Sequence, residues 1–332
     1  MTVTRRARNA IILGVLGALL IAVPFIVGLS EFYLNVFIMV GIYMILAMSF
    51  QFLNQLSLLN FGHPAYMGMG AYTSAVLTIR LGIPFWVALP IAGIVPMLIG
   101  GLVGIPTLRV GMVPFFMISL TILSLFPVVM SNYWSDLFGG FNGLAGVRSP
   151  TVSLPGLPEA TLGHGMGYYY LTLVIVLVTI VFFWNLDRTR FGKVARAIGS
   201  QELTVDAVGV DTFKAKMTAM MIACFFAGIA GSLYAHYIGV VSPSDFGMQP
   251  LILMQVYAIV GGMGSVFGPV VGATIVGAVS IFLTNMEVWG EFVFGVILII
   301  VLLLSPDGLW GIGQRIAGRL RRVQREVEEA QP

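Results

Sequence analysis

The chain has 332 residues, of which 58% are hydrophobic and only 9% carry a charged side chain. Soluble domains have roughly 25% charged residues, so this composition, with a mean hydropathy of +0.98, excludes a large soluble domain and indicates a membrane protein. The isoelectric point near 9.1 does not indicate nucleic-acid binding, because the basic residues lie in short loops between apolar segments. The single cysteine, Cys224, excludes an internal disulfide, and no Cys/His spacing predicts a metal site.

The apolar segments predict the fold class. A membrane-spanning helix needs about 20 predominantly apolar residues, so we expect an all-α, polytopic membrane protein of about ten transmembrane helices within residues 1–311. The first span is expected to be an uncleaved helix and not a signal peptide. The predicted spans cover residues 10–29, 32–52, 61–80, 84–107, 112–133, 167–186, 216–237, 249–262, 266–286 and 290–305.

The charges predict how these spans are oriented. If the N-terminus is cytoplasmic and ten spans alternate, every lysine and arginine except Arg80 and Arg148 falls in a cytoplasmic segment. This is the distribution that the positive-inside rule requires, and one span more or less would invert half of it. We therefore expect a multi-pass protein of the cell (inner) membrane with its N- and C-termini in the cytoplasm.

Three segments are expected to lie outside the lipid core. The outer loop, 134–166, is rich in turn residues. The inner loop, 187–215, is the most charged part of the chain. In the C-terminal tail, 312–332, apolar residues recur at helical spacing with arginines between them, which predicts a basic amphipathic cytoplasmic helix that lies on the anionic lipid surface.

The spans lack the groups that would power transport from within the chain. A carrier driven by its own ion gradient usually keeps ionisable residues at mid-membrane depth, and the middle of every predicted span is free of Asp, Glu, Lys and Arg. A P-loop needs a glycine-rich run that ends in Lys-Ser or Lys-Thr, and none of Lys193, Lys214 and Lys216 stands in such a run. The sequence therefore predicts a non-catalytic chain without a cofactor, whose energy would come from another subunit.

Two segments with several Gly and Pro residues, 60–77 and 260–273, interrupt the apolar pattern, one in each half of the chain. Paired interruptions of this kind indicate a translocation path, because irregular backbone at membrane depth is tolerated only where protein or a water-filled cavity satisfies it. The alternative for any single glycine is tight helix packing. The candidates for the path are Asn60, Gly62, His63, Tyr66, Gly70, Tyr72, Gly261, Gly262, Gly264, Ser265 and Gly268.

The inner loop combines mixed charges, helix-compatible stretches and a break at Gly209. A mixed-charge helix followed by glycine can project from the membrane face and fit a groove on a cytoplasmic partner. Its composition is equally compatible with a solvated loop that only obeys the positive-inside rule.

A family resemblance covers roughly residues 30–311. Five segments carry it: LNFGHPAYMGMGAYT (59–73), FGGFNGL (138–144), the stretch 197–243, VGGMGSVFGPVVGA (260–273) and SPDGLWG (305–311). In the same order, they resemble segments of the branched-chain amino acid ABC transporter permease family, and within it of the M-type subunits of Leu/Ile/Val importers. Ser305 stands where the family often has a basic residue, a local difference at the inner face.

The resemblance implies a permease of the type II ABC importer class. Its partners would be a second, H-type permease subunit, two cytoplasmic ATPase subunits and an extracytoplasmic substrate-binding protein. By the family pattern, the inner loop contains the helix that couples the permease to an ATPase. The residues expected to take part are Arg196, Glu202, Asp206, Ala207 and Gly209.

The expected function is ATP-driven import of branched-chain amino acids delivered by the binding protein. Two alternatives remain at this stage: a self-contained channel or facilitator for a small neutral solute such as urea, and an ABC permease for urea, amides or a sugar. The inner loop distinguishes the importer from the first alternative, because a facilitator has no need of a projecting cytoplasmic helix.

Overall fold

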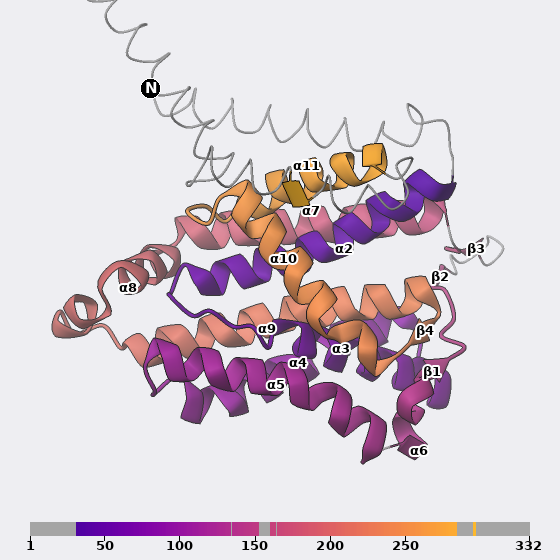
Figure 1. The fold of residues 1–332 in the computed structure, drawn as a ribbon, viewed down its shortest axis with the longest axis horizontal. Helices are drawn as coiled ribbons and strands as arrows, with labels where there is room; N and C mark the ends of the chain where they lie inside the picture. The colour runs from indigo at the N-terminus through magenta and orange to yellow at the C-terminus, as the bar shows by residue number, and fades with distance from the viewer. Residues whose placement is uncertain (1–30, 134, 153–159, 164, 284–294, 297–332) are drawn as a thin grey trace, which may run out of the picture.

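The computed structural model describes residues 31–133, 135–152, 160–163, 165–283 and 295–296. Its long helices lie in two layers (Figure 1). The first layer contains α2 (Glu31–Asn54), α7 (Met166–Arg188) and α11 (Gly268–Leu283). The second contains α3 (His63–Arg80), α4 (Phe85–Thr107), α5 (Met112–Asn132) and α9 (Thr212–Ile238). A further helix, α10 (Met248–Gly261), crosses from one layer to the other.

The short elements gather at the two ends of the layers. At one end, α8 (Arg190–Ala207) projects beyond the other helices, and we call this the α8 end. At the opposite end, the strand end, β1 pairs with β4 and β2 with β3, both antiparallel. The elements of the strand end are α6 (Ser135–Phe138), η1 (Gly140–Asn142), β1 (Leu144–Ala145), β2 (Thr151–Val152), β3 (Ala160–Thr161), β4 (Val240–Val241) and η2 (Pro243–Phe246).

Two helices organise the core. In α2, nearly every residue from Val40 to Leu53 is buried, because α7, α9, α10 and α11 all pack against it. In the second layer, α9 lies against both α3 and α4. Glycines allow this close approach: a Cβ on Gly228 would lie 2.1 Å from the carbonyl oxygen of Ala92, and one on Gly231 would lie 1.8 Å from that of Met67. Backbone packing through small residues is typical of membrane helices.

Local signals explain where several helices begin and end. Pro64 occupies the first turn of α3, where its missing N–H costs nothing. The hydroxyl of Thr189 accepts from Gly192 N–H and caps α8, and the carboxylate of Asp211 accepts from Lys214 N–H and caps α9. Gly239, with φ of +79°, ends α9 in the left-handed conformation that glycine adopts without strain.

A buried polar network fixes the strand end to α3 and α9. The hydroxyl of Ser232 donates to Ser74 over 2.8 Å, and Ser74 lies 2.9 Å from His236 Nε2. The other ring nitrogen of His236 lies 2.7 Å from the carbonyl oxygen of Arg148. Because that oxygen can only accept, the ring donates from Nδ1 and accepts from Ser74 at Nε2.

The all-α, polytopic fold class is confirmed, and eight of the predicted spans coincide with helices that the structure describes. Within the described residues, five helices, α2, α4, α5, α7 and α9, are long and apolar enough to cross a membrane. The others, α3, α10 and α11, are shorter, at 18, 14 and 16 residues. The predicted span 10–29, nearly all of 290–305 and the predicted amphipathic tail, 312–332, lie outside the described residues.

The two predicted loops contain more regular structure than their composition suggests. The outer loop, 134–166, contains a short α-helix, a 3₁₀ turn and two-residue strands. Most of the inner loop, 187–215, is α8, which consists of two helical segments that meet at a kink at Gln201, where the backbone leaves helical geometry (φ −154°, ψ 88°).

Candidate functional site

The junction between α2 and α3 contains the first of the predicted path residues. Ser49 and Gln51 face inward from the last turns of α2, and both are fully buried. His63, the first residue of α3, lies with Nε2 2.8 Å from the Ser49 hydroxyl. Because that hydroxyl donates to Leu46 O, His63 Nε2–H donates to Ser49, and Nδ1 remains an acceptor with no partner among the described residues.

A second part of this junction faces α4, α5 and α9. Asn60 and Tyr66 line a narrow recess together with Thr107 and Ser119. The recess has no room for a water molecule. The Asn60 amide lies 3.4 Å from the sulfur of Met220, while Asn60 Oδ1 and the Tyr66 hydroxyl have no hydrogen-bond partner in the described part of the chain.

Unpartnered polar atoms are therefore concentrated at the junction. Of the five buried side-chain atoms without a partner in the described residues, four lie between Gln55 and Tyr66. Each buried, unsatisfied polar group costs roughly 1–3 kcal/mol. A fold that retains several such groups in one place needs a specific reason to do so.

The glycines of the first segment lie at close helix contacts. A Cβ on Gly62 would lie 2.8 Å from Ser119 O, and one on Gly70 would lie 2.4 Å from Gly228 Cα on α9. Tyr72 lies toward the strand end, where its hydroxyl donates to Val241 O over 3.2 Å. Its ring packs edge-on against Phe138 and Phe246, with centroids 5.3 and 6.3 Å away.

The second segment forms the turn between α10 and α11 at the α8 end. A Cβ on Gly261 would lie 1.6 Å from Gly268 O, and one on Gly268 would lie 2.1 Å from Gly262 O, so only glycine fits at these two positions. Gly262 has φ of +109°. Ser265 accepts from Phe267 N–H over 3.2 Å, whereas Gly264 has open space around it.

The structure brings both segments against α2. His63 binds Ser49, and the Gln51 amide donates to the carbonyl oxygen of Met263 in the α10–α11 turn. Sequence reasoning missed Ser49 and Gln51. The sequence did contain a signal for them. Apart from two tyrosines and Asn35 near its start, Ser49 and Gln51 are the polar residues of the apolar span 32–52.

The predicted coupling residues lie on or just after α8. Glu202 forms an ion pair with Lys216 of α9 at 2.5 Å, and the Lys216 side chain is only 10% exposed. Arg196 forms an ion pair with Asp187 at the end of α7. Asp206 and Ala207 are exposed, and Gly209 has φ of +84° with open space around it. The ion pairs hold α8 to α7 and α9.

Two apolar residues on this projection were missed by sequence reasoning. Leu203 is 86% exposed and Val208 is 74% exposed, among the largest values for apolar side chains in the described residues. They flank Asp206 and Ala207. An apolar residue within a mixed-charge helix is also typical of a helix that packs on its neighbours, so the sequence did not show which way these two point.

Two carboxyl groups outside the long helices have shifted pKa values. The backbone N–H of Lys214 donates to Asp211, and together with the Lys214 ammonium, 3.0 Å away, it holds the pKa of this carboxyl below its usual value. At the strand end, burial raises the pKa of Asp245, and the N–H of Ser242, which donates to the carboxylate over 3.0 Å, acts in the opposite direction.

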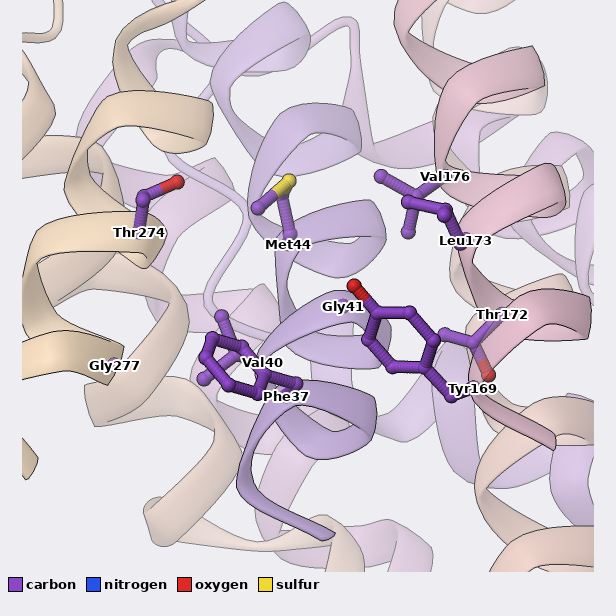
Figure 2. Close-up of a pocket in the computed structure, with 10 residues that line it drawn as sticks. All are labelled: Phe37, Val40, Gly41, Met44, Tyr169, Thr172, Leu173, Val176, Thr274 and Gly277. Atoms are coloured by element: carbon purple, nitrogen blue, oxygen red, sulfur yellow. The ribbon is translucent and has the colours of Figure 1, made fainter. Parts of the chain in front are cut away.

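A larger recess, with a cavity volume of about 60 Å³, lies elsewhere, between α2, α7 and α11. Figure 2 shows its side chains on α2 in the centre, α7 on one side and α11 on the other. The lining is almost wholly apolar, and it offers no set of converging polar groups that would orient a ligand. Its residues are Phe37, Val40, Gly41, Met44, Tyr169, Thr172, Leu173, Val176, Thr274 and Gly277.

Comparison with known families gives one match that spans most of the chain. Residues 32–302 match the family described as "Branched-chain amino acid transport system / permease component". The match includes both glycine-rich segments and α8. No solved structure matches the chain.

Curated relatives agree with the family match. The chain is 27% identical to the high-affinity branched-chain amino acid transport system permease protein LivM of Salmonella typhimurium LT2, over 87% of this chain and 72% of that protein. It is 26% identical to LivM of Escherichia coli K12, over 88% and 72%. It is 24% identical to a probable branched-chain amino acid transport permease protein, LivH, of Methanocaldococcus jannaschii, over 79% and 85%.

Proposed function

This chain belongs to the family of branched-chain amino acid transport permeases and is a multi-pass membrane subunit of an ABC importer, and we propose that its cargo is a branched-chain amino acid delivered by an extracytoplasmic binding protein. The position and exposed surface of α8 are the observation that favours an ABC permease over a self-contained facilitator. This element extends beyond the other helices, and Leu203 on it and Val208 just after it are exposed. A facilitator gains nothing from such a surface, whereas a subunit driven by an ATPase requires one.

The coupling surface consists of Leu203, Asp206, Ala207 and Val208, followed by Gly209. Exposed apolar side chains next to a charged one are the kind of surface that a protein partner can cover. Glu202 and Arg196 act behind this surface, because their ion pairs with Lys216 and Asp187 hold α8 to α9 and α7. A push on the surface is thereby transmitted to two membrane helices.

The path residues are the two segments that meet α2. The described conformation is closed at the junction, because the recess beside Asn60 and Tyr66 has no room for water. Opening would hydrate Asn60 Oδ1, His63 Nδ1 and the Tyr66 hydroxyl, and so recover the roughly 1–3 kcal/mol that each unsatisfied group costs. This gain offsets part of the apolar surface exposed on opening, so that closed and open states are close enough in free energy for a partner to switch them.

A path of this composition suits a zwitterion with an aliphatic side chain. Between their end turns, the described spans carry no Asp, Glu, Lys or Arg. The ammonium and carboxylate of an amino acid would meet hydroxyls, amides and backbone dipoles, and its side chain would meet apolar walls. Neutral contacts bind weakly enough to release the cargo, and the binding protein supplies the selection.

The complete importer contains further subunits. We propose a second, H-type permease, two cytoplasmic ATPases and the binding protein, with this chain in the inner membrane and both termini in the cytoplasm. This chain itself does not hydrolyse ATP, because its sequence contains no P-loop. The α8 end, which carries all the described lysines and arginines except Arg80 and Arg148, faces the cytoplasm.

The test is purification of the tagged protein from native membranes in mild detergent, with mass spectrometry of the proteins that accompany it. We expect a P-loop ATPase and a second permease at stoichiometric levels. The substrate-binding protein of the importer is then titrated with leucine, isoleucine, valine and urea. Recovery of the chain alone in several mild detergents would contradict the importer, and a binding protein that prefers urea would contradict the cargo only.

A further inference from the structure

A tight backbone contact joins α8 to the turn that follows α2. A Cβ on Gly199 would lie only 2.0 Å from the carbonyl oxygen of Gln55 and 3.6 Å from Leu56 Cα. The hydroxyl of Ser57 donates to the carbonyl oxygen of Gly199 over 3.0 Å. No side chain separates the two backbones, so a displacement of the α8 segment before the Gln201 kink meets no flexible group at this contact that could absorb it.

The turn itself is held in one conformation. Ser57 has φ of +58°, and within the described residues it is the one non-glycine residue in the left-handed region. Backbone hydrogen bonds close the turn onto α2, from Ser57 N–H to Asn54 O over 3.0 Å and from Leu58 N–H to Leu53 O over 3.2 Å. A non-glycine residue in this conformation costs about 1–2 kcal/mol, and the contact with Gly199 is one of the interactions that maintain it.

The same turn adjoins both path segments. Asn60 and His63 follow it directly in the chain, and His63 binds Ser49 on the last turns of α2. Gln51, one helical turn before the 55–57 turn, donates to Met263 O between α10 and α11. Phe191 of α8 adds a ring contact to Phe52 of α2 at 6.1 Å.

We propose that the contact of Gly199 with residues 55–57 is the joint through which movement of α8 reaches both path segments at once. Gly199 and Ser57 are positioning residues that touch neither cargo nor ATPase. The inference rests on the proposed function, because it assumes that an ATPase moves α8. The competing route passes along the chain from α8 into α9, through the Glu202–Lys216 ion pair.

The experiment uses the complete importer in proteoliposomes, with three single variants of this chain. Gly199→Ala places a methyl group where it cannot fit and moves α8 away from the turn. Ser57→Gly removes the hydroxyl donor and relieves the left-handed strain, so folding is favoured. Ser200→Ala is the matched control on the same helix, because the Ser200 hydroxyl bonds only within α8, to Ala197 O. Leucine uptake, ATP hydrolysis and bound ATPase subunit are measured together.

We expect Gly199→Ala to keep the ATPase bound and to raise the number of ATP molecules hydrolysed per leucine imported by about tenfold. Ser57→Gly should shift the same ratio by a few-fold, and Ser200→Ala should leave it unchanged. A merely structural role would lower uptake and hydrolysis together and leave the ratio as it was.

Each other outcome decides the question. A wild-type ratio in Gly199→Ala with the ATPase bound overturns the joint and favours the route through α9. If Gly199→Ala does not reach the membrane, the ratio in Ser57→Gly decides, and a wild-type ratio there overturns the joint. If no ATPase binds even the wild-type chain, the proposed function fails, and this result is distinct from failure of the joint.

Discussion

At the scale of single residues, glycines have two different roles in this protein. Gly70, Gly261 and Gly268 lack a side chain because another backbone occupies the space. Gly209 has open space around it, and its φ of +84° alone accounts for its identity. The two roles predict different tolerances to substitution, and Gly209 tests the second of them.

Gly209 should tolerate asparagine and not valine. Valine in the left-handed region is strained by about 1–2 kcal/mol or more, whereas asparagine adopts it readily. We expect Gly209→Val to reduce coupled transport about tenfold while the chain still inserts, and Gly209→Asn to keep most of it. Uptake and ATP hydrolysis in proteoliposomes measure this, and normal coupled transport in Gly209→Val would count against a coupling role for the segment after α8.

Removing the charge of Asp245 is expected to preserve or raise the stability of the protein. Burial raises the pKa of Asp245 in the folded state, so the ionised carboxylate destabilises the folded protein. This destabilisation is complete at a pH above the folded-state pKa and absent at a pH below the unfolded-state pKa. Asp245→Asn keeps an acceptor for Ser242 N–H without the charge. At pH 7 it should leave the melting temperature unchanged or raise it, whereas Asp245→Ala should lose about 0.5–2 kcal/mol with the cap.

Thermal unfolding in detergent, followed by tryptophan fluorescence, measures the Asp245 variants. Asp136→Asn is the matched control, because Asp136 is an exposed acid at the same end of the molecule. A large loss of stability in Asp245→Asn at pH 7 would show that the charge itself stabilises the strand end.

At the scale of elements, α8 is the part of the fold whose exposed surface most needs a partner. Its buried residues, such as Ala195 and Ile198, face the membrane helices, and its ion pairs fix its position. Leu203 and Val208 face away from them. Isolated exposed apolar residues are common on soluble proteins, but two of them close together at the projecting end of an importer subunit favour a docking surface.

Leu203 is the residue that tests this surface. Because its side chain is 86% exposed, Leu203→Asp should not disturb folding. It should reduce the amount of ATPase that copurifies by about tenfold or more, as expected for the apolar centre of an interface. Leu203→Met, which keeps the apolar volume, is the control and should retain the ATPase. Equal recovery in all three proteins would exclude Leu203 from the interface.

At the scale of the whole molecule, α9 holds the second layer together. It packs against α3 and α4 through glycines on successive turns, and its ion pair and polar network reach α8 at one end and the strand end at the other. Because water does not drive helices together within lipid, this close packing is the main source of cohesion.

Gly231→Ala should therefore destabilise the entire fold. Its Cβ would lie 1.8 Å from Met67 O, and overpacking of this kind costs about 1–3 kcal/mol or more. We expect a clear drop in melting temperature and in recovery of monodisperse protein. Gly101→Ala is the control on the facing helix α4, where the nearest heavy atom would be 3.4 Å away. Equal stability of the two variants would contradict the close α3–α9 contact.

Composition and local periodicity, which can be read along the chain, are enough to establish that this protein is all-α, that it crosses the membrane many times, and that residues 60–77 and 260–273 interrupt its spans. The contacts between its elements come from the three-dimensional structure alone. There, Ser49 binds His63 of the first segment, Gln51 binds Met263 of the second, Gly199 packs on the 55–57 turn, and Leu203 and Val208 are exposed. Helix periodicity fixes which residues share a face but not which neighbour that face meets, because contacts between different helices depend on how the helices pack.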